Sequence, residues 1–181
     1  LGLSYYFALA EHKDLTIDPK IYINENPVLQ AEYRHVTKKS NSIIDASFNQ
    51  GYKKTTTKKT SGTRNHFFAK THIDLDFENF DESSFKLNVQ TVSNDTYLRV
   101  HNISSDLIDN NTIMKSSAEL NLSKDDSIFD LDMHVYESLN KTDNRYEYII
   151  PSYTYRNKLF YLDKLGEFNF VSSGSYKQFE T

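Results

Sequence analysis

The sequence contains no cysteine and no tryptophan, and only five glycines and three prolines among 181 residues. Without cysteine, this stretch can form neither a disulfide nor a thiolate metal site. It has no glycine-rich phosphate-binding loop. It also lacks an apolar run of about 20 residues, the length that a transmembrane helix needs. These absences exclude a helical membrane protein but not a membrane β-barrel, whose apolar residues occupy every second position.

Charge and side-chain chemistry give little support for other function classes. The net charge of −4 argues against a nucleic-acid partner, which usually binds a basic surface. The histidines are His12, His35, His66, His72, His101 and His134. Their spacing matches no metal motif, and no nucleophile elbow is visible. We therefore expect no catalytic residue, no metal site and no cofactor.

Alternation of polar and apolar residues is the main pattern of the chain. It runs through residues 29–34, 44–49, 72–77, 85–90, 117–122 and 129–135. A period of two is typical of strands with one apolar face, and no segment shows a convincing helical period. The pattern predicts an all-β antiparallel meander of roughly ten strands of about 9–13 residues. We expect a single region over residues 1–181, without an internal domain boundary.

Connections of unequal length separate these strands. Tight turns are predicted at 24–27, 38–41, 79–82 and 124–126, and longer loops at 53–63, 102–111 and 138–144. Short turns at one end of a sheet and long loops at the other suit a membrane barrel.

Alternation alone does not tell what covers the apolar face. In a soluble β-sandwich a second sheet covers it, whereas in a membrane barrel lipid does. We expect one common face to hold Ile73, Leu75, Phe77, Phe85, Leu87, Val89, Phe129, Leu131 and Met133. The sandwich predicts that these side chains are buried, and the barrel predicts that they are substantially exposed.

The first residues predict a hairpin. Two β-type runs, Tyr5–Ala10 and Asp14–Ile23, flank the polar residues 11–13. Pro19 falls inside the second run and has no N–H to donate to a neighbouring strand. It therefore marks either a strand end or a place where pairing is weak.

These residues resemble a known family. The similarity rests on Tyr5-Tyr6-Phe7, Ala10, Asp14-Leu15-Thr16 and Pro19, followed in order by 32–34, 92–97 and Pro151 with Tyr153 and Tyr155. This order is similar to the β-barrel domain of LptD, the outer-membrane protein that inserts lipopolysaccharide into the outer leaflet. One departure is Ser4, which stands where the family has a proline.

The resemblance implies the amino-terminal portion of a large transmembrane β-barrel in the Gram-negative cell outer membrane. In this family, an upstream periplasmic jelly-roll domain receives lipopolysaccharide from an LptA-type bridge, and an LptE-like lipoprotein plugs the lumen. Lipid leaves through a lateral seam at the first strand. The implied seam residues are Ser4, Tyr5, Tyr6, Phe7, Ala8, Leu9, Ala10 and Pro19.

Four lysines in the predicted 53–63 loop have two interpretations. Lys53, Lys54, Lys58 and Lys59 form a charge run that is usually a solvated loop. Alternatively, they bind lipopolysaccharide phosphates as point charges. Two other functions also stay open for the chain, a passive outer-membrane channel or porin and a soluble β-sandwich binding module.

Overall fold

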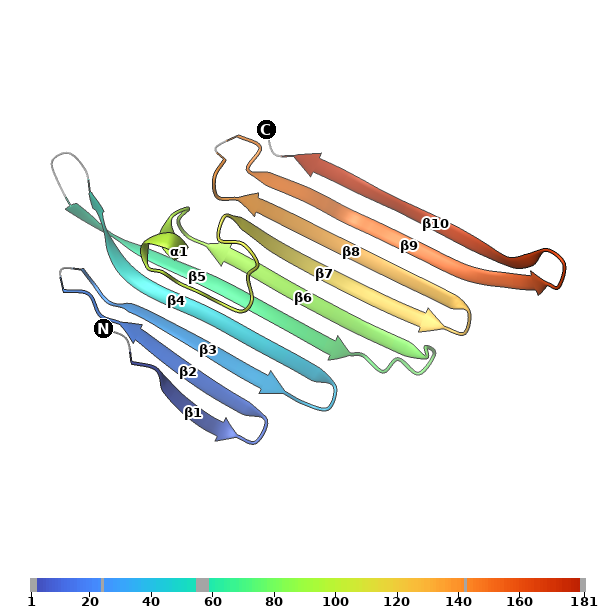
Figure 1. Cartoon of the computed structure of the whole chain (residues 1–181), viewed down its shortest axis with the longest axis horizontal. Coiled ribbons are helices and arrows are strands. Elements are labelled where there is room, and N and C mark those ends of the chain that lie inside the picture. Colours follow the sequence, from blue (N-terminus) through green and yellow to red (C-terminus); the bar gives the residue numbers. More distant parts are fainter. Residues whose placement is uncertain (1–2, 24, 55–58, 142, 180–181) are drawn as a thin grey trace.

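The computed structural model describes residues 3–23, 25–54, 59–141 and 143–179. One antiparallel sheet contains all ten strands in sequence order, and it is open, with β1 and β10 at its edges (Figure 1). The strands are β1 (Tyr5–Ala10), β2 (Lys13–Lys20), β3 (Val28–Val36), β4 (Ser40–Lys54), β5 (Lys59–Asp74), β6 (Glu82–Val92), β7 (Ile113–Lys124), β8 (Ser127–Ser138), β9 (Tyr146–Leu162) and β10 (Gly166–Phe179). A short helix, α1 (Tyr97–Val100), lies between β6 and β7. The predicted all-β antiparallel meander is confirmed.

Some predicted boundaries are wrong. Strand lengths run from 6 residues in β1 to 17 in β9, a wider range than expected. The predicted 53–63 loop is also wrong, because β4 and β5 stay paired as far as Lys54 and Lys59. This ribbon extends past both neighbours, whose pairing ends at Asn49 on β4 and His66 on β5.

The register places the predicted apolar stripe on one face. Residues opposite each other in an antiparallel pair share a face, and Phe85 lies opposite Ile73 on one side and Leu120 on the other. Leu75 and Phe77 follow the end of β5 rather than lying within it. None of the stripe residues is buried; Leu87 is 36% and Met133 39% exposed. Among the described residues, no second sheet covers this apolar face.

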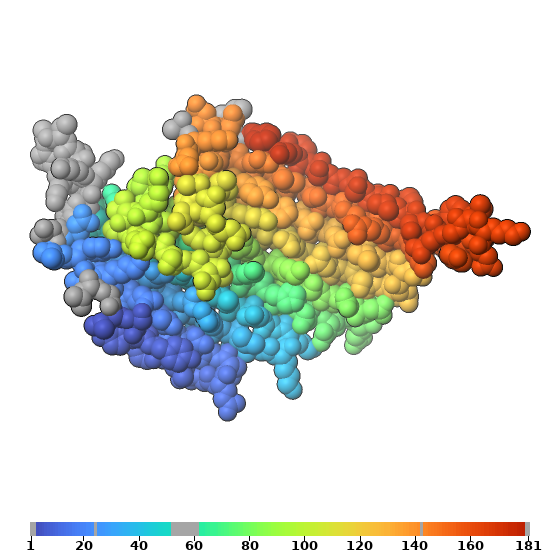
Figure 2. Space-filling view, in the orientation of Figure 1, coloured from blue at the N-terminus to red at the C-terminus, as the bar shows by residue number. Residues whose placement is uncertain are grey.

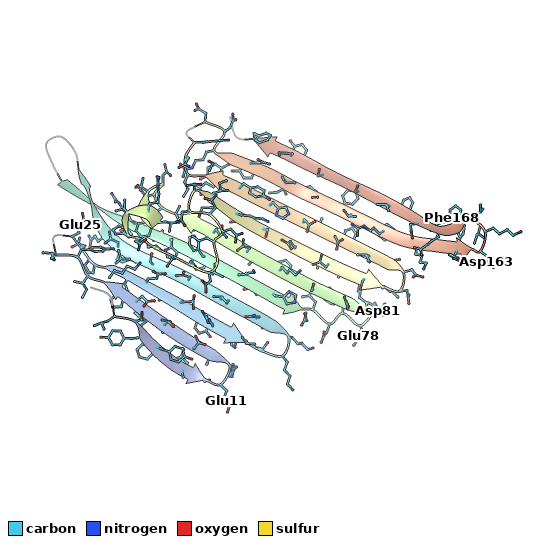
Figure 3. The ribbon with its side chains drawn as sticks, viewed as in Figure 1. Glu11, Glu25, Glu78, Asp81, Asp163 and Phe168 are labelled. Atoms are coloured by element: carbon cyan, nitrogen blue, oxygen red, sulfur yellow. The ribbon has the colours of Figure 1, made fainter. Side chains whose placement is uncertain are left out.

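The two ends of the sheet differ in their connections. The turns after β1, β3, β7 and β9 are short and lie at one end, where the labelled Glu11 and Asp163 are found (Figure 3). The longer connection 75–81 between β5 and β6 lies at this end too, near the labelled Glu78, and replaces the tight turn predicted at 79–82. The connections at the opposite end, near Glu25, include residues 93–112 between β6 and β7 and 139–145 between β8 and β9. The expected separation is therefore only partial, with the longest connection, 93–112, at one end and a connection of intermediate length, 75–81, among the short turns of the other.

Candidate functional site

Residues 93–112, here called the 93–112 connection, fold back over the polar face of the sheet. They form a mound on the face seen in Figure 2, with α1 lying over β4 and β5 in Figure 1. An apolar core holds them there, made of Val28, Phe68, Tyr97, Leu98, Ile103, Leu107, Met114 and Leu139. Burial of such side chains contributes about 1.5–3 kcal/mol each. The connection is thus a packed element and not a free loop.

A chain of hydrogen bonds lies beneath α1. The hydroxyls of Tyr97 and Ser47 are 2.8 Å apart, and Ser47 Oγ is 2.6 Å from His66 Nδ1. On the other side of the ring, His66 Nε2 is 3.1 Å from Asp45 Oδ1. Because an ionised carboxylate only accepts, the Nε2–H of His66 donates a hydrogen bond to Asp45. Ser47 Oγ lies between His66 Nδ1 and the Tyr97 hydroxyl, so every group in the chain has a hydrogen-bond partner.

This Asp45–His66–Ser47 order resembles the proton relay of a serine hydrolase, but its surroundings do not suit catalysis. Ser47 is only 5% exposed, and its hydroxyl is already shared between His66 and Tyr97. A nucleophile needs room for a substrate carbonyl and nearby oxyanion donors. We interpret the four residues as a network that fixes α1 to the sheet.

Polar contacts also join the 93–112 connection to strands β2 and β3. Lys20 Nζ on β2 donates to the carbonyl of Asn102 at 2.8 Å. Gln30 Nε2 on β3 donates to the Ser104 carbonyl at 3.3 Å and to Asp45 at 3.1 Å. The connection therefore links the first hairpin, through β2, to the middle of the sheet.

Two further contacts hold the other parts of the connection. Gln90 Nε2 on β6 donates to the Leu107 carbonyl at 2.7 Å. Arg145 pairs with Asp95 at 2.7 Å and with Glu137 at 2.5 Å, and these hydrogen bonds raise the pKa of its guanidinium.

At the end of α1, burial lowers the pKa of His101, which favours its neutral form.

The predicted seam residues lie at the free edge of the sheet. Every residue from Ser4 to Ala10 is exposed, and β1 pairs only with β2. Pairing with β1 reaches Ile17, whereas Pro19 lies two residues further along β2, opposite Leu29 on β3. The Ser4 hydroxyl donates to the Asp18 carboxylate next to Pro19. Pro19 thus lies inside β2, where the pairing with β1 has already ended.

The predicted phosphate-binding lysines are not brought together with the seam. Lys53 and Lys54 lie in β4 and Lys59 in β5, while Lys58 lies outside the described residues. The backbone places this group at the end of the β4–β5 ribbon, several strands away from β1.

A cavity of about 640 Å³ lies between the 93–112 connection and the polar face of β5 to β8. Its wall on the sheet carries Lys70, Lys86, Lys115 and Glu119 together with Tyr136. The connection contributes Asp106, Leu107, Asp109 and Asn110. The sequence analysis did not identify this cavity or the buried network. The sequence does contain one sign of a covering element. Phe68 is an apolar residue at a polar-face position of β5, between His66 and Lys70.

Other features place limits on the site. In the part of the chain that the structure describes, no cluster of three or more His, Asp or Glu residues could hold a metal ion. No described helix has the length and apolar character to cross a membrane.

Compared with models of protein families and with curated protein sequences, the chain matches none of them.

Proposed function

We propose that this region forms part of a transmembrane β-barrel of the outer membrane that transports lipopolysaccharide and inserts it into the outer leaflet. The observation that carries the proposal is the distribution of burial over the two faces. The apolar face is uncovered across the described sheet, while the polar face holds the packed 93–112 connection. A soluble protein would cover its apolar face and leave its polar face in water. If lipid surrounds the apolar face, the opposite arrangement is explained.

The edges of the sheet support the same proposal. Tyr6 in β1 and Val171 in β10 are among many exposed apolar residues on the two edge strands. Soluble proteins protect such edges because unpaired N–H and C=O groups recruit other chains. Closure with further strands in a barrel satisfies the backbone of both edges.

The tip of the β9–β10 hairpin also suits a membrane surface. Pairing with β8 ends at Asn157, so the tip projects beyond the neighbouring strands, with Phe168 near its end (Figure 3). Its exposed apolar residues include Leu159, Phe160, Tyr161, Leu162 and Leu165. Aromatic residues gather at the membrane–water interfaces of barrels.

The lipopolysaccharide part of the proposal comes from the resemblance to LptD at the first hairpin. A seam that opens sideways needs a weakly paired first strand, and β1 is short, exposed and paired with β2 only as far as Ile17. Lipopolysaccharide would arrive through an upstream jelly-roll domain supplied by an LptA-type bridge. An LptE-like lipoprotein would fill lumen that the 93–112 connection leaves open.

A passive outer-membrane channel is the second candidate. The observation that favours it is the 93–112 connection itself, which would narrow a lumen from inside. A channel needs no weakly paired first strand. The two candidates therefore differ in one respect: lipopolysaccharide passes the edge of β1 in the transporter, and nothing passes it in the channel.

Photocrosslinking in the full-length protein, reconstituted with its partners, separates the candidates. A photoreactive residue replaces Phe7 on the apolar face of β1 or, as a matched control, Phe129 on the apolar face of β8. We expect lipopolysaccharide to crosslink at position 7 only while it is being delivered, and position 129 to show no dependence on delivery. Equal, delivery-independent crosslinking at both positions would contradict transport through the seam.

A further inference from the structure

His101 lies where the 93–112 connection meets the first strands of the sheet. It follows directly after α1, and it is only 4% exposed. The centre of its ring lies 5.0 Å from that of Tyr97 and 5.7 Å from that of Tyr22. The imidazole therefore packs against one aromatic ring of α1 and one from the segment that follows β2.

The backbone beside this ring is bound to the same part of the sheet. The carbonyl of His101 accepts hydrogen bonds from Lys20 Nζ and from the Tyr22 hydroxyl, each at 3.4 Å. The next carbonyl, that of Asn102, accepts from Lys20 Nζ at 2.8 Å. Lys20 is the last residue of β2, the strand that pairs with β1. Departure of the His101 ring from its site would therefore also release the connection from the end of β2.

The surroundings of His101 suit a neutral imidazole and not an imidazolium. Within the described part of the chain, its buried Nε2 has no hydrogen-bond partner. An imidazolium carries an N–H on both ring nitrogens, so protonation would leave a buried, charged donor without an acceptor. An unpaired charged group costs more free energy than an unpaired neutral one.

Charged groups from neighbouring segments add to this preference. Burial lowers the pKa of His101 most; Glu25 acts in the opposite direction, and Arg64 on β5 and Lys20 on β2 lower it again. One carboxylate thus stands against two cations. The other titratable groups around the site are Tyr22, Tyr97 and the exposed Arg99 of α1, with the buried pair of Asp45 and His66 beyond Tyr97.

We propose that His101 makes the 93–112 connection a proton-sensitive latch on the first hairpin. Neutral His101 keeps the connection bound to Lys20 and Tyr22, and protonation favours the released connection, in which the imidazolium reaches water. The latch itself does not depend on lipopolysaccharide transport. If the proposed function is also correct, acid frees β2, the strand next to the seam.

The direction of the pH effect follows from proton linkage. The pKa of a released histidine is about 6.5, and burial lowers the pKa of His101 in the packed state. Between these two pKa values the released state binds more protons. The packed state is therefore fully favoured above about pH 6.5 and loses stability as the pH falls below it. Between about pH 7.5 and pH 5.5, the equilibrium constant for release can rise by up to about tenfold.

Limited proteolysis of the folded full-length protein in detergent tests the latch. A nonspecific protease is used at several values between about pH 7.5 and pH 5.5. The measured quantity is the rate of cleavage within residues 93–112 divided by the rate within 75–81, at the opposite end of the sheet. Because both rates come from one digest, the ratio removes the pH dependence of the protease. We expect the ratio to rise by up to about tenfold as the pH falls, and to return when the pH is restored.

Variants identify the titrating group. His101→Phe keeps an aromatic ring against Tyr22 and Tyr97 but cannot be protonated, and His101→Gln is a second variant that does not titrate. In both, the ratio should stay within about twofold over the same pH range. His12→Gln is the matched control, because His12 is an exposed histidine in the turn between β1 and β2. It should keep the full rise of the wild type.

A further variant decides the case in which both His101 variants already release the connection at about pH 7.5. Glu25→Gln removes the carboxylate that favours protonated His101 in the packed state. It should therefore enlarge the acid-induced rise or extend it to lower pH. A rise identical to that of the wild type would then overturn the latch.

Two other results would overturn the proposal. One is a wild-type ratio that does not change with pH, and the other is an equal rise in the wild type and in a His101 variant. The digestion needs no lipopolysaccharide, so its outcome is independent of the crosslinking experiment. Crosslinking at position 7 without acid-induced release would leave the transport proposal intact and overturn the latch. Acid-induced release that requires His101, without crosslinking at position 7, would do the reverse.

Discussion

Phe67 and Phe68 are neighbours in β5 with identical side chains and opposite surroundings. Phe67 lies on the apolar face opposite Ala46 and is 43% exposed. Phe68 lies on the polar face opposite Asp45 and is fully buried, with its ring 4.4 Å from that of His66. The comparison shows that burial in this sheet depends on what covers a face and not on the polarity of that face.

The same contrast extends over the whole sheet. The apolar face is uniform and lacks a covering element among the described residues. The polar face is uneven, because the 93–112 connection builds a local core around Phe68 and Val28 and leaves β9 and β10 bare. One sheet therefore has an uncovered apolar face and a polar face that is partly covered by its own connection.

The largest expected effect is at Phe68. Phe68→Ala removes a fully buried ring from the core under the 93–112 connection, at a cost of about 3–5 kcal/mol to the packed state. The equilibrium constant for release of the connection should rise by about two orders of magnitude or more. Limited proteolysis between residues 93 and 112 in the folded full-length protein measures this release.

Phe67→Ala is the matched control for the same experiment. It removes the same kind of ring from the neighbouring residue, which lies on the apolar face. The 93–112 connection covers the opposite face. The protease sensitivity of residues 93–112 should stay within about twofold of wild type. Equal sensitivity of the two variants would show that Phe68 does not hold the connection.

A smaller effect is expected on the apolar face itself. Leu131→Lys places an ammonium on the surface assigned to lipid, and it should cost about 2–4 kcal/mol if the position lies near the bilayer midplane. Asp132→Lys is the neighbouring control, because Asp132 points to the polar face opposite Glu119, with which a lysine can pair. Urea unfolding from lipid vesicles gives both free energies. A loss at position 132 as large as that at position 131 would reverse the assignment of the two faces.

The regular part of the fold could be predicted from the sequence because alternation is a local signal. Each strand shows its own apolar face, as at Phe85, Leu87 and Val89, and the order of a meander follows from short connections. The β4–β5 ribbon was predicted wrongly because Lys53 to Thr63 has the composition of a loop. Extended pairing there depends on the partner strand, which composition does not show.

The site could not be predicted in the same way. The 93–112 connection has no periodicity, and its position depends on long-range contacts such as Tyr97 with Ser47 and Lys20 with Asn102. The cavity exists only because that connection covers lysines from three strands. Residues such as Phe68, which break the polar phase of a strand, indicate a covering element but do not identify it.

The smallest effect concerns the seam, where the apolar and polar faces meet at the free edge of β1. Pro19 supplies no N–H in β2, and the Ser4 hydroxyl contacts Asp18 just beside it. Pro19→Ala restores a donor two residues beyond the last β1–β2 pair. Extension of that pairing by one hydrogen bond would contribute about 0.5–1.5 kcal/mol net. If opening breaks that bond, the open seam becomes roughly 2- to 13-fold less populated.

We therefore expect Pro19→Ala to reduce lipopolysaccharide crosslinking at positions 6 and 7, and Ser4→Pro, which removes an N–H and the contact with Asp18, to increase it. Positions 6 and 7 report on opposite faces, since Tyr6 lies on the polar face and Phe7 on the apolar face. Pro27→Ala is the control, because Pro27 precedes β3 and its carbonyl still accepts from Asn49 at 3.0 Å. If Pro19→Ala and Pro27→Ala give the same crosslinking and the same outer-membrane integrity, Pro19 only limits how far β2 pairs with β1. A change at position 7 without one at position 6 would mean that the seam admits lipid from the apolar side alone.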